Sequence, residues 1–99
     1  MDGTTYDDVA ARAHDIRTIL ARYGMVDPRV FGSVARGDDR PDSDLDIVVR
    51  KTRAVGLITQ ARMRREIAEI VGRPVDVVGE DALHGHVRPN VLRDARPLP

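Results

Sequence analysis

The segment from Val30 to Val49 constrains the fold of this 99-residue chain more than any other part of it. A short apolar run ends in Gly32-Ser33, and ten residues later Asp44-Leu45-Asp46 opens a second apolar run. Short runs of β-branched residues bounded by turn residues predict two strands. A Gly-Ser turn and two carboxylates two residues apart are parts that can hold a triphosphate together with a metal ion.

Composition and charge narrow the class of protein. The chain is 41% hydrophobic and 32% charged, which is typical of a soluble globular domain. Its net charge of zero argues against a broad surface for duplex nucleic acid, so nucleic acid is not expected as a direct partner. The absence of cysteine excludes disulfides and cysteine-bound zinc. With no long apolar run and no signal peptide, we expect one cytoplasmic domain over residues 1–99 that binds no membrane.

Hydrophobic periodicity predicts a chain in which helices and strands alternate. The expected helices cover Thr4–Tyr23, Val55–Val71 and, more briefly, Pro89–Ala95, with single helical turns near Val34–Arg36 and Ala82. The expected strands cover Arg29–Phe31, Leu45–Arg50 and Val75–Val78. The two longer helices should therefore pack against a small sheet.

Three local features carry expectations of their own. Asp27-Pro28 is expected to turn the chain into the first strand. Leu57 and Ile58 are expected on the apolar face of their helix. Pro97 and Pro99 mark a tail from about residue 96 with little regular structure.

The connections between strands predict the sheet topology. A helix joins the second and third strands, so these strands should run parallel. The Gly-Ser turn leaves the first strand, whereas the Asp pair enters the second, so the two meet at one site only if these strands are antiparallel. The expected fold class is α/β (α+β), a small mixed sheet of three or four strands with helices packed on one side.

Three carboxylates are the candidate catalytic and metal-binding residues. Side chains at i and i+2 of a strand share a face, so Asp44 and Asp46 should project together. Carboxylates this close repel each other, and a divalent cation with a preference for oxygen ligands, Mg²⁺ or Mn²⁺, relieves the repulsion. Asp76 enters the parallel third strand at the same sheet end and can complete the cluster. The other reading places Asp76 on an exposed strand face without a role.

The Gly-Ser turn supplies the candidate nucleotide-binding residues. Gly32 allows a ligand to approach the backbone, Ser33 adds a hydroxyl donor, and a following helical turn would present free N–H groups to an anion. Arg36 lies three residues further on, within reach of a phosphate or of the Asp cluster, although a solvated surface arginine fits the sequence equally well. His84 and His86 are expected in a loop rather than in a metal site.

These motifs resemble those of a known family. Gly32-Ser33, ten intervening residues and Asp44-Leu45-Asp46 resemble the signature of the DNA polymerase beta-like nucleotidyltransferase superfamily. More closely, the strings F-G-S-V-A-R-G, S-D-L-D-I and R-P-V-D-V-V resemble minimal nucleotidyltransferase (MNT) domains, which are usually the antitoxin halves of HEPN/MNT toxin–antitoxin modules. The resemblance covers about residues 5–95, and no motif residue is missing.

The resemblance implies a fold, a reaction and a partner. It implies a nucleotidyltransferase fold in which Gly32 and Ser33 contact the triphosphate of ATP, while Asp44, Asp46 and Asp76 bind two Mg²⁺ ions. AMP would pass by in-line displacement to a tyrosine of a cognate HEPN ribonuclease toxin, with release of pyrophosphate, in a hetero-oligomer. Because little of the chain lies outside the sheet and its helices, the acceptor should bring its own binding surface.

Two other functions remain open at the level of sequence. The chain could be a binding-only antitoxin that blocks its toxin by occlusion, or a nucleotidyltransferase that acts on a small molecule or an RNA end. The sequence leaves open the number of AMP groups transferred and whether Asp76 is only an ion ligand or also the general base.

Overall fold

The computed structural model describes residues 4–83, 85 and 87–98 of the chain. Its helices are α1 (Thr5–Ala10), α2 (Ala13–Arg22), α3 (Gly32–Arg36), α4 (Leu57–Val71) and α5 (Val87–Asp94), with a short 3₁₀ helix, η1 (Glu80–Ala82). Its strands are β1 (Met25–Phe31), β2 (Leu45–Lys51), β3 (Val75–Gly79) and β4 (Arg96–Pro97). Within these described ranges, no helix is both long and apolar enough to cross a membrane.

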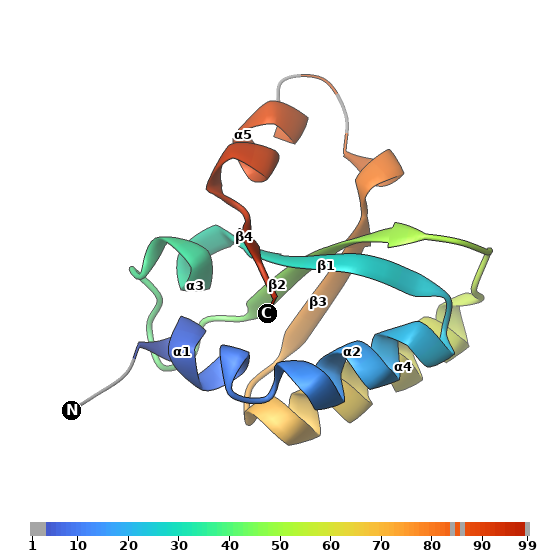
Figure 1. Cartoon of the computed structure of the whole chain (residues 1–99), viewed down its shortest axis with the longest axis horizontal. Helices are drawn as coiled ribbons and strands as arrows, with labels where there is room; N and C mark the ends of the chain where they lie inside the picture. Colours follow the sequence, from blue (N-terminus) through green and yellow to red (C-terminus); the bar gives the residue numbers. More distant parts are fainter. Residues whose placement is uncertain (1–3, 84, 86, 99) are drawn as a thin grey trace.

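The four strands form one mixed sheet in the order β3-β2-β1-β4. β1 is antiparallel to β2 and to β4, whereas β2 and β3 run parallel and are joined through α4. Helices α2 and α4 pack together along the sheet, and α5 lies on the other side of the strands (Figure 1). The expected mixed sheet and both expected strand directions are confirmed, and the sheet has the fourth strand. The expectation that the helices pack on one side of the sheet holds for α2 and α4 and is wrong for α5 (Figure 1).

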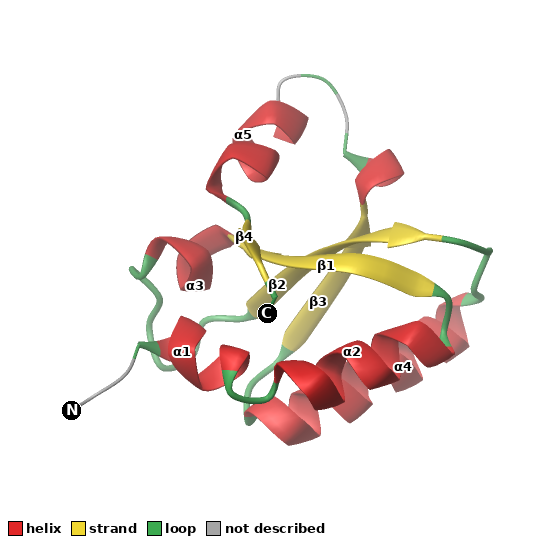
Figure 2. Ribbon diagram, in the orientation of Figure 1, coloured by secondary structure: helices red, strands yellow, loops and turns green. Residues whose placement is uncertain are grey.

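The core lies between the sheet and the paired helices α2 and α4 (Figure 2). The alternating residues Leu45, Ile47 and Val49 of β2 are fully buried and belong to the same apolar cluster as Ile16 and Ile67 of these helices. Each fully buried side chain of this size stabilises the fold by about 1.5–3 kcal/mol. The alternation leaves Asp46 on the opposite face of β2, away from this core.

The predicted helix over Thr4–Tyr23 is wrong in one respect, because the chain forms two helices. Arg12 leaves the helical region of the backbone, with φ −107° and ψ 14°, and ends the continuity between α1 and α2. Thr4 caps α1 in a reciprocal capping box with Asp7. Hydrogen bonds of Thr5 and Tyr6 to Asp39 and Pro97 hold α1 apart, and such tertiary contacts outweigh helix propensity.

The expected turn at Asp27-Pro28 is wrong, because these residues lie within β1. The strand begins at Met25, and its register against β2 shifts between Val26 and Arg29. Asp27 adopts a positive φ of 52° at this bulge, and a bulge accommodates a proline that cannot donate a ladder hydrogen bond.

The expected irregular tail is also wrong for the described residues. Arg96 and Pro97 pair with Val30 and Arg29 as β4, and Leu98 is buried in the core. Proline suppressed the strand signal, yet an edge strand tolerates it. Pro99 lies outside the described residues, as do His84 and His86, so the expectation that these histidines form a loop stays a prediction.

The expected burial of Leu57 and Ile58 is wrong. They start α4 and are 83% and 80% exposed, whereas Met63 and Ile67 of the same helix are buried. The first turn of α4 is therefore exposed, and the helix is buried only from its middle onward. The last predicted helix is confirmed as α5. The helical turn expected to begin at Ala82 is misplaced, because the turn η1 ends at Ala82 and Leu83 is extended.

Candidate active site

The three predicted carboxylates lie together at the end of the sheet where β2 and β3 begin. Asp44 immediately precedes β2, and Asp46 is its second residue, on the face opposite the core. Asp46 and Asp76 are register partners across the parallel β2–β3 pair. Asp44 and Asp76 are exposed, while Asp46 is half-buried. The alternation of strand side chains and the parallel register thus bring the predicted residues to one place.

The environment of Asp46 disfavours its negative charge. Burial raises the pKa of the Asp46 carboxyl most, and the nearby charges of Asp76 and then Asp44 raise it further. The Arg36 guanidinium acts in the opposite sense and lowers this pKa. The three carboxylates therefore interact electrostatically, and Arg36 only partly offsets their repulsion.

The Asp46 carboxylate lies directly against the backbone of Gly32. Gly32 begins α3 with a φ of +73°, and a Cβ atom built on it would lie 2.5 Å from Oδ2 of Asp46. A side chain at this position would be strained and would also displace the carboxylate. Ser33 follows in the first turn of α3, half-buried. The sequence predicted a helical turn after the Gly-Ser pair, and the structure confirms it from Gly32 onward.

Arg36 ends α3 close to the carboxylates. Its Nε donates to Oδ2 of Asp38 at 3.2 Å, and its side chain is largely exposed. Its effect on the pKa of Asp46 shows that it lies near enough to interact with the cluster. Arg36 is therefore a surface residue whose charge acts on Asp46, and its binding of a phosphate stays a prediction.

A pocket of about 240 Å³ adjoins the Gly-Ser turn. Its walls come from β1 and α3 on one side and from α5 on the other, namely Phe31, Gly32, Arg36, Asn90, Val91 and Asp94. The α5 residues were not predicted as site residues. No local motif marks them, because only the packing of α5 over α3 brings them to the turn.

The donor set fits a divalent cation that is shared with a phosphate ligand. Among the side chains that the structure describes, there is no cluster of three or more His, Cys, Asp or Glu residues placed to hold a metal ion. Mg²⁺ does not require one, because it usually takes one or two carboxylates and fills its remaining positions with water and substrate phosphates. The raised pKa of Asp46, caused partly by its acidic neighbours, is the electrostatic state that a cation relieves.

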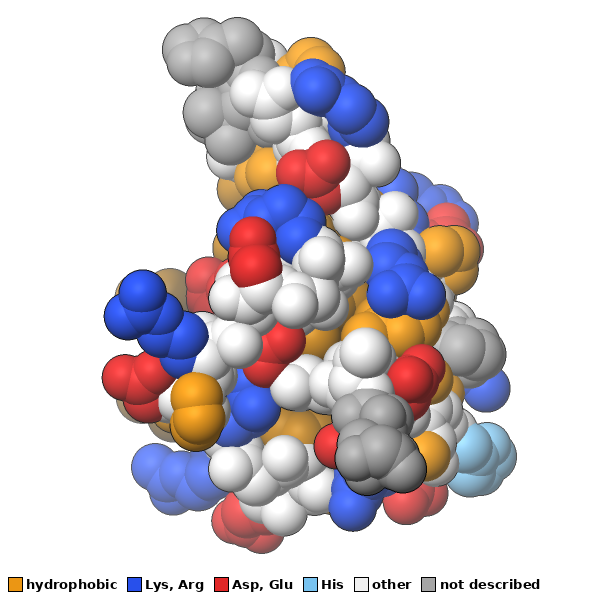
Figure 3. Space-filling model, turned by 90° about the vertical axis from the view of Figure 1, so that its left-hand side faces the viewer, with side chains coloured by type: hydrophobic (Ala, Val, Ile, Leu, Met, Phe, Trp, Pro, Cys, Tyr) orange, Lys and Arg blue, Asp and Glu red, His pale blue; other side chains and the backbone are white. Residues whose placement is uncertain are grey.

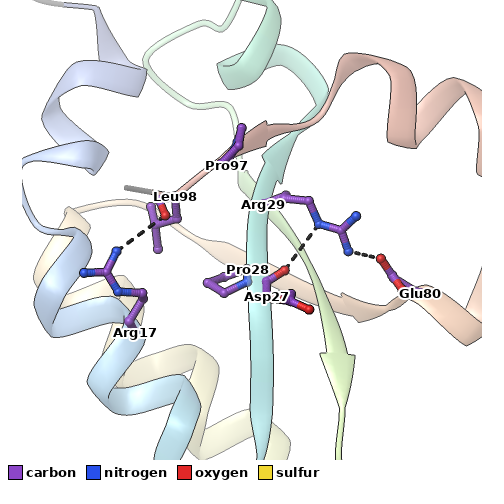
Figure 4. A pocket seen from close by; sticks show the side chains of 7 residues that line it. All are labelled: Arg17, Asp27, Pro28, Arg29, Glu80, Pro97 and Leu98. Carbon is purple, nitrogen blue, oxygen red and sulfur yellow. Dashed lines mark hydrogen bonds and ion pairs between the residues drawn. The ribbon is translucent and has the colours of Figure 1, made fainter.

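A larger pocket of about 460 Å³ lies elsewhere and contains none of the predicted site residues (Figure 4). Arg29 and Glu80 form an ion pair on one side of it, and Arg17 donates to the carbonyl oxygen of Leu98 on the other. These polar groups have partners within the chain. The 240 Å³ pocket, by contrast, is lined by the predicted site residues Gly32 and Arg36.

The surface near α1 and α3 carries charges of both signs. Acidic and basic side chains are interspersed on this face, without a continuous basic area (Figure 3). The pattern agrees with the zero net charge of the sequence.

Comparisons with known proteins identify the fold and the family. A family model described as a nucleotidyltransferase domain matches residues 15–98. The chain is 32% identical over 78 residues to the protein adenylyltransferase MntA of Thermococcus cleftensis, and the match covers 79% of each chain. A solved structure described as a candidate minimal nucleotidyltransferase is 38% identical, with a TM-score of 0.77 and coverage of 100% of this chain and 96% of that chain.

Two more distant structures share the fold. One is a toxin–antitoxin complex with AMP-PNP, at a TM-score of 0.73 and 20% identity, with 87% of this chain and 71% of that chain covered. The other is a tri-AMPylated Shewanella oneidensis HEPN toxin with an MNT antitoxin, at 0.67 and 18%, with 89% and 69% covered. The family model spans most of the chain, and the carboxylates of the family motif meet at one sheet end beside Gly32. The chain therefore belongs to the nucleotidyltransferase domain family, as its resemblance to the minimal nucleotidyltransferases predicts.

Proposed function

We propose that this chain is an antitoxin enzyme that transfers AMP from ATP to a tyrosine hydroxyl of a HEPN-type ribonuclease toxin. The observation that carries the proposal is the coupled cluster of Asp44, Asp46 and Asp76 beside the Gly32-Ser33 turn. The curated relative named a protein adenylyltransferase supports a protein as the acceptor. The fold shared with antitoxins in complexes with AMP-PNP and with an AMPylated toxin supports ATP and the toxin as its two ligands.

The carboxylates supply the binding site for the metal. Asp44, Asp46 and Asp76 would hold two Mg²⁺ ions, and Mn²⁺ is the other ion of suitable chemistry. Such ions stabilise the charge of the reacting phosphates and lower the pKa of an attacking hydroxyl. Asp46 contributes a carboxylate that occupies the space a side chain at position 32 would need.

The remaining residues bind and orient the substrates. Ser33 and the first N–H groups of α3 bind the triphosphate, and Arg36 adds a positive charge on the same side. The tyrosine oxygen forms a bond to the α-phosphorus of ATP, the bond from this phosphorus to the bridging oxygen breaks, and pyrophosphate leaves. Asp76 lies exposed on the neighbouring strand, where it can accept the hydroxyl proton or ligate the ion next to it.

Label transfer from ATP tests the proposal. The purified chain is incubated with its HEPN partner, Mg²⁺ and ATP labelled at the α-phosphate, and the label is expected on the partner protein. Asp44→Asn and Asp46→Asn should abolish labelling, because each removes an ion ligand. The matched control is Asp15→Asn, an equal change at an exposed position on α2. Unchanged labelling in either site variant would show that the metal assignment is wrong.

The labelling experiment, together with a cell-protection assay and the mass of the toxin, separates the two other functions. Label on a small molecule or an RNA end instead of protein would identify a different acceptor. Protection of cells by the Asp variants, with no change in the mass of the toxin, would identify an antitoxin that acts by occlusion alone. A gene for a helical protein with an Arg-x4-6-His motif beside the gene for this chain would identify the partner to use.

A further inference from the structure

A partly buried ion pair between Asp39 and Arg73 anchors the loop that carries Asp44. The loop runs from residue 37 to residue 44, between α3 and β2, and the Asp39 side chain within it is only 9% exposed. Nη1 of Arg73 lies 3.3 Å from Oδ2 of Asp39, and the Arg73 side chain is only 16% exposed. The Thr5 hydroxyl donates to the same carboxylate oxygen at 2.6 Å. Thr5 of α1 and Arg73 thus both hold the loop at Asp39.

The second contact of Arg73 reaches the residue next to Asp44. Its Nη1 also donates to the carbonyl oxygen of Ser43 at 3.2 Å. On the other side, the N–H of Leu45 donates to the carbonyl oxygen of Pro74 at 2.8 Å. Both peptide groups that flank Asp44 are therefore hydrogen-bonded to the Arg73-Pro74 dipeptide.

The Asp44 side chain itself is exposed, and no hydrogen bond to it is found among the described residues. The backbone of Asp44 therefore sets only the direction of its Cα–Cβ bond, and the contacts on either side of Asp44 hold that backbone in place. A carboxylate that binds an ion from an exposed position loses less freedom on binding when its backbone is already fixed.

We propose that Arg73, held by Asp39, is a positioning residue that fixes the backbone of Asp44 for binding of a divalent cation. The proposal rests on the proposed function, since that function makes Asp44 an ion ligand. Partners that orient a ligating carboxylate, without touching the ion, are worth about 10–100-fold in metal affinity or activity. Arg73 would orient Asp44 in the same way, through its hydrogen bond to the Ser43 carbonyl oxygen.

Helix α1 supports the same loop anchor through Thr5. The match to the family model begins at residue 15, so Thr5 lies outside the matched range while its partner Asp39 lies inside it. The hydroxyl of Thr5 and the guanidinium of Arg73 both lower the pKa of the Asp39 carboxyl, which keeps this residue ionised for its pairing with Arg73. Loss of the Thr5 hydroxyl alone should therefore loosen the loop with a smaller effect than loss of Arg73.

The test compares Arg73→Gln, Arg73→Lys and Thr5→Val with Arg65→Gln in the full chain. Arg65 is an exposed arginine of α4, so its change serves as the matched control. Binding of Mn²⁺ in the presence of AMP-PNP is measured from the electron paramagnetic resonance signal of free Mn²⁺. AMP transfer is measured separately over a range of Mg²⁺ concentrations.

Arg73→Gln is expected to weaken Mn²⁺ binding about tenfold and to raise the Mg²⁺ concentration for half-maximal transfer by a similar factor. Transfer at saturating Mg²⁺ should largely recover, and Arg73→Lys should restore part of the Mn²⁺ affinity because it keeps a positive donor. Arg65→Gln should behave as the wild type. A folded Arg73→Gln protein with wild-type Mn²⁺ affinity would overturn the proposal.

Thr5→Val keeps the test decisive if Arg73→Gln does not fold. It keeps the shape of the side chain and removes one hydroxyl, so Mn²⁺ affinity should fall while the fold is kept, and wild-type affinity would overturn the proposal. A wild-type chain that binds no Mn²⁺ would overturn it as well. A wild-type chain that binds Mn²⁺ with the expected dependence on Arg73 but transfers no AMP would refute the proposed function and leave the positioning role supported.

Discussion

At the scale of single residues, Gly32 matters to the site because it has no side chain and so leaves room for the Asp46 carboxylate. Its Cα faces the Asp46 carboxylate so closely that a methyl group would lie 2.5 Å from Oδ2. The motif predicted that Gly32 lets a ligand approach the backbone. The structure adds that the same absence makes room for a neighbouring carboxylate, which no spacing along the chain reveals.

We predict that Gly32→Ala abolishes AMP transfer, while Gly37→Ala retains it. Both positions have a positive φ, so each substitution should cost about 1–2 kcal/mol of stability through backbone strain alone. Only position 32 has atoms in the way, because nothing lies within 4 Å of a Cβ at Gly37. Chemical denaturation and a transfer assay on both variants check this, and equal activity in the two would refute the role given to Gly32.

The pKa of Asp46 leads to a prediction about pH. Because this pKa is raised above its usual value of about 3.9, ionised Asp46 destabilises the folded state at neutral pH. In metal-free buffer, Asp46→Asn should therefore melt at a higher temperature than the wild type at pH 7. The difference should shrink as the pH falls through the raised folded pKa and should vanish below the unfolded pKa, where Asp46 is protonated in both states.

Mg²⁺ with AMP-PNP provides the control for Asp46. It should raise the melting temperature of the wild type and leave that of Asp46→Asn nearly unchanged, because bound ligands stabilise only the state that binds them. A lower melting temperature for Asp46→Asn in metal-free buffer would contradict the electrostatic description of the site.

Asp39 should show the opposite dependence on pH. The Thr5 hydroxyl lowers the pKa of Asp39 most, burial partly opposes it, and Arg73 adds to the lowering. The ionised carboxylate thus stabilises the fold above pH of about 3.9, and this stability is lost as the pH falls through the lower folded pKa. Asp39→Asn should be less stable than the wild type at pH 7, and urea denaturation at falling pH should show the gap closing in acid.

At the scale of elements, β2, β3 and the strand directions could be predicted from the sequence, while the start of β1, the strand β4 and several helix details could not. β2 and β3 are short β-branched runs whose connection dictates parallel pairing, and both were predicted nearly to the residue. The break between α1 and α2 gives no local signal, because Tyr6 and Val9 continue the apolar spacing of α2. The contacts of α1 with Asp39 and Pro97 produce the break, and they depend on residues far away in the chain.

The candidate site shows the same division. Asp44, Asp46 and Gly32 lie within one continuous stretch, and the strand register alone brings Asp76 to them. The α5 wall of the small pocket and the Arg73 contact involve segments that the motif does not reach. Sequence patterns therefore predict residues on adjacent strands better than those supplied by packing between helices and loops.

Tyr6 joins α1 to β4, and we predict a measurable cost when its hydroxyl is removed. That hydroxyl donates to the carbonyl oxygen of Pro97 at 2.5 Å, and the Arg96 guanidinium lies 3.6 Å from the centre of the ring. Tyr6→Phe keeps the ring and should cost about 1 kcal/mol, the usual net value of one hydrogen bond. Denaturation measures the loss. Faster hydrogen exchange at Leu98, whose N–H donates to Pro28, should report the loosening of this edge.

The start of α4 should tolerate polar residues. Leu57→Ser and Ile58→Ser are expected to change stability by no more than about 0.5 kcal/mol, because both side chains are exposed. Ile67→Ala in the same helix, at a fully buried position, should cost about 2–5 kcal/mol. Thermal melts of the three variants compare the two halves of α4, and a large loss at Leu57 would mean that it is packed.

At the scale of the whole molecule, the mixed sheet places chemistry and stability on different faces. The face toward α2 and α4 carries the apolar core, and the other face carries the carboxylates where β2 and β3 begin. Substitutions of the carboxylates should therefore affect transfer without unfolding the chain. This separation is what makes the proposed enzyme testable by variants that remain folded.

The intact mass of the HEPN partner after co-expression tests the central claim most directly. With the wild-type chain, the partner should gain mass in whole increments of one AMP. With Asp46→Asn it should keep the mass of its own sequence, while Asp15→Asn should reproduce the wild-type result. An unmodified partner with a wild-type chain that is folded and bound to it would contradict the proposed AMP transfer.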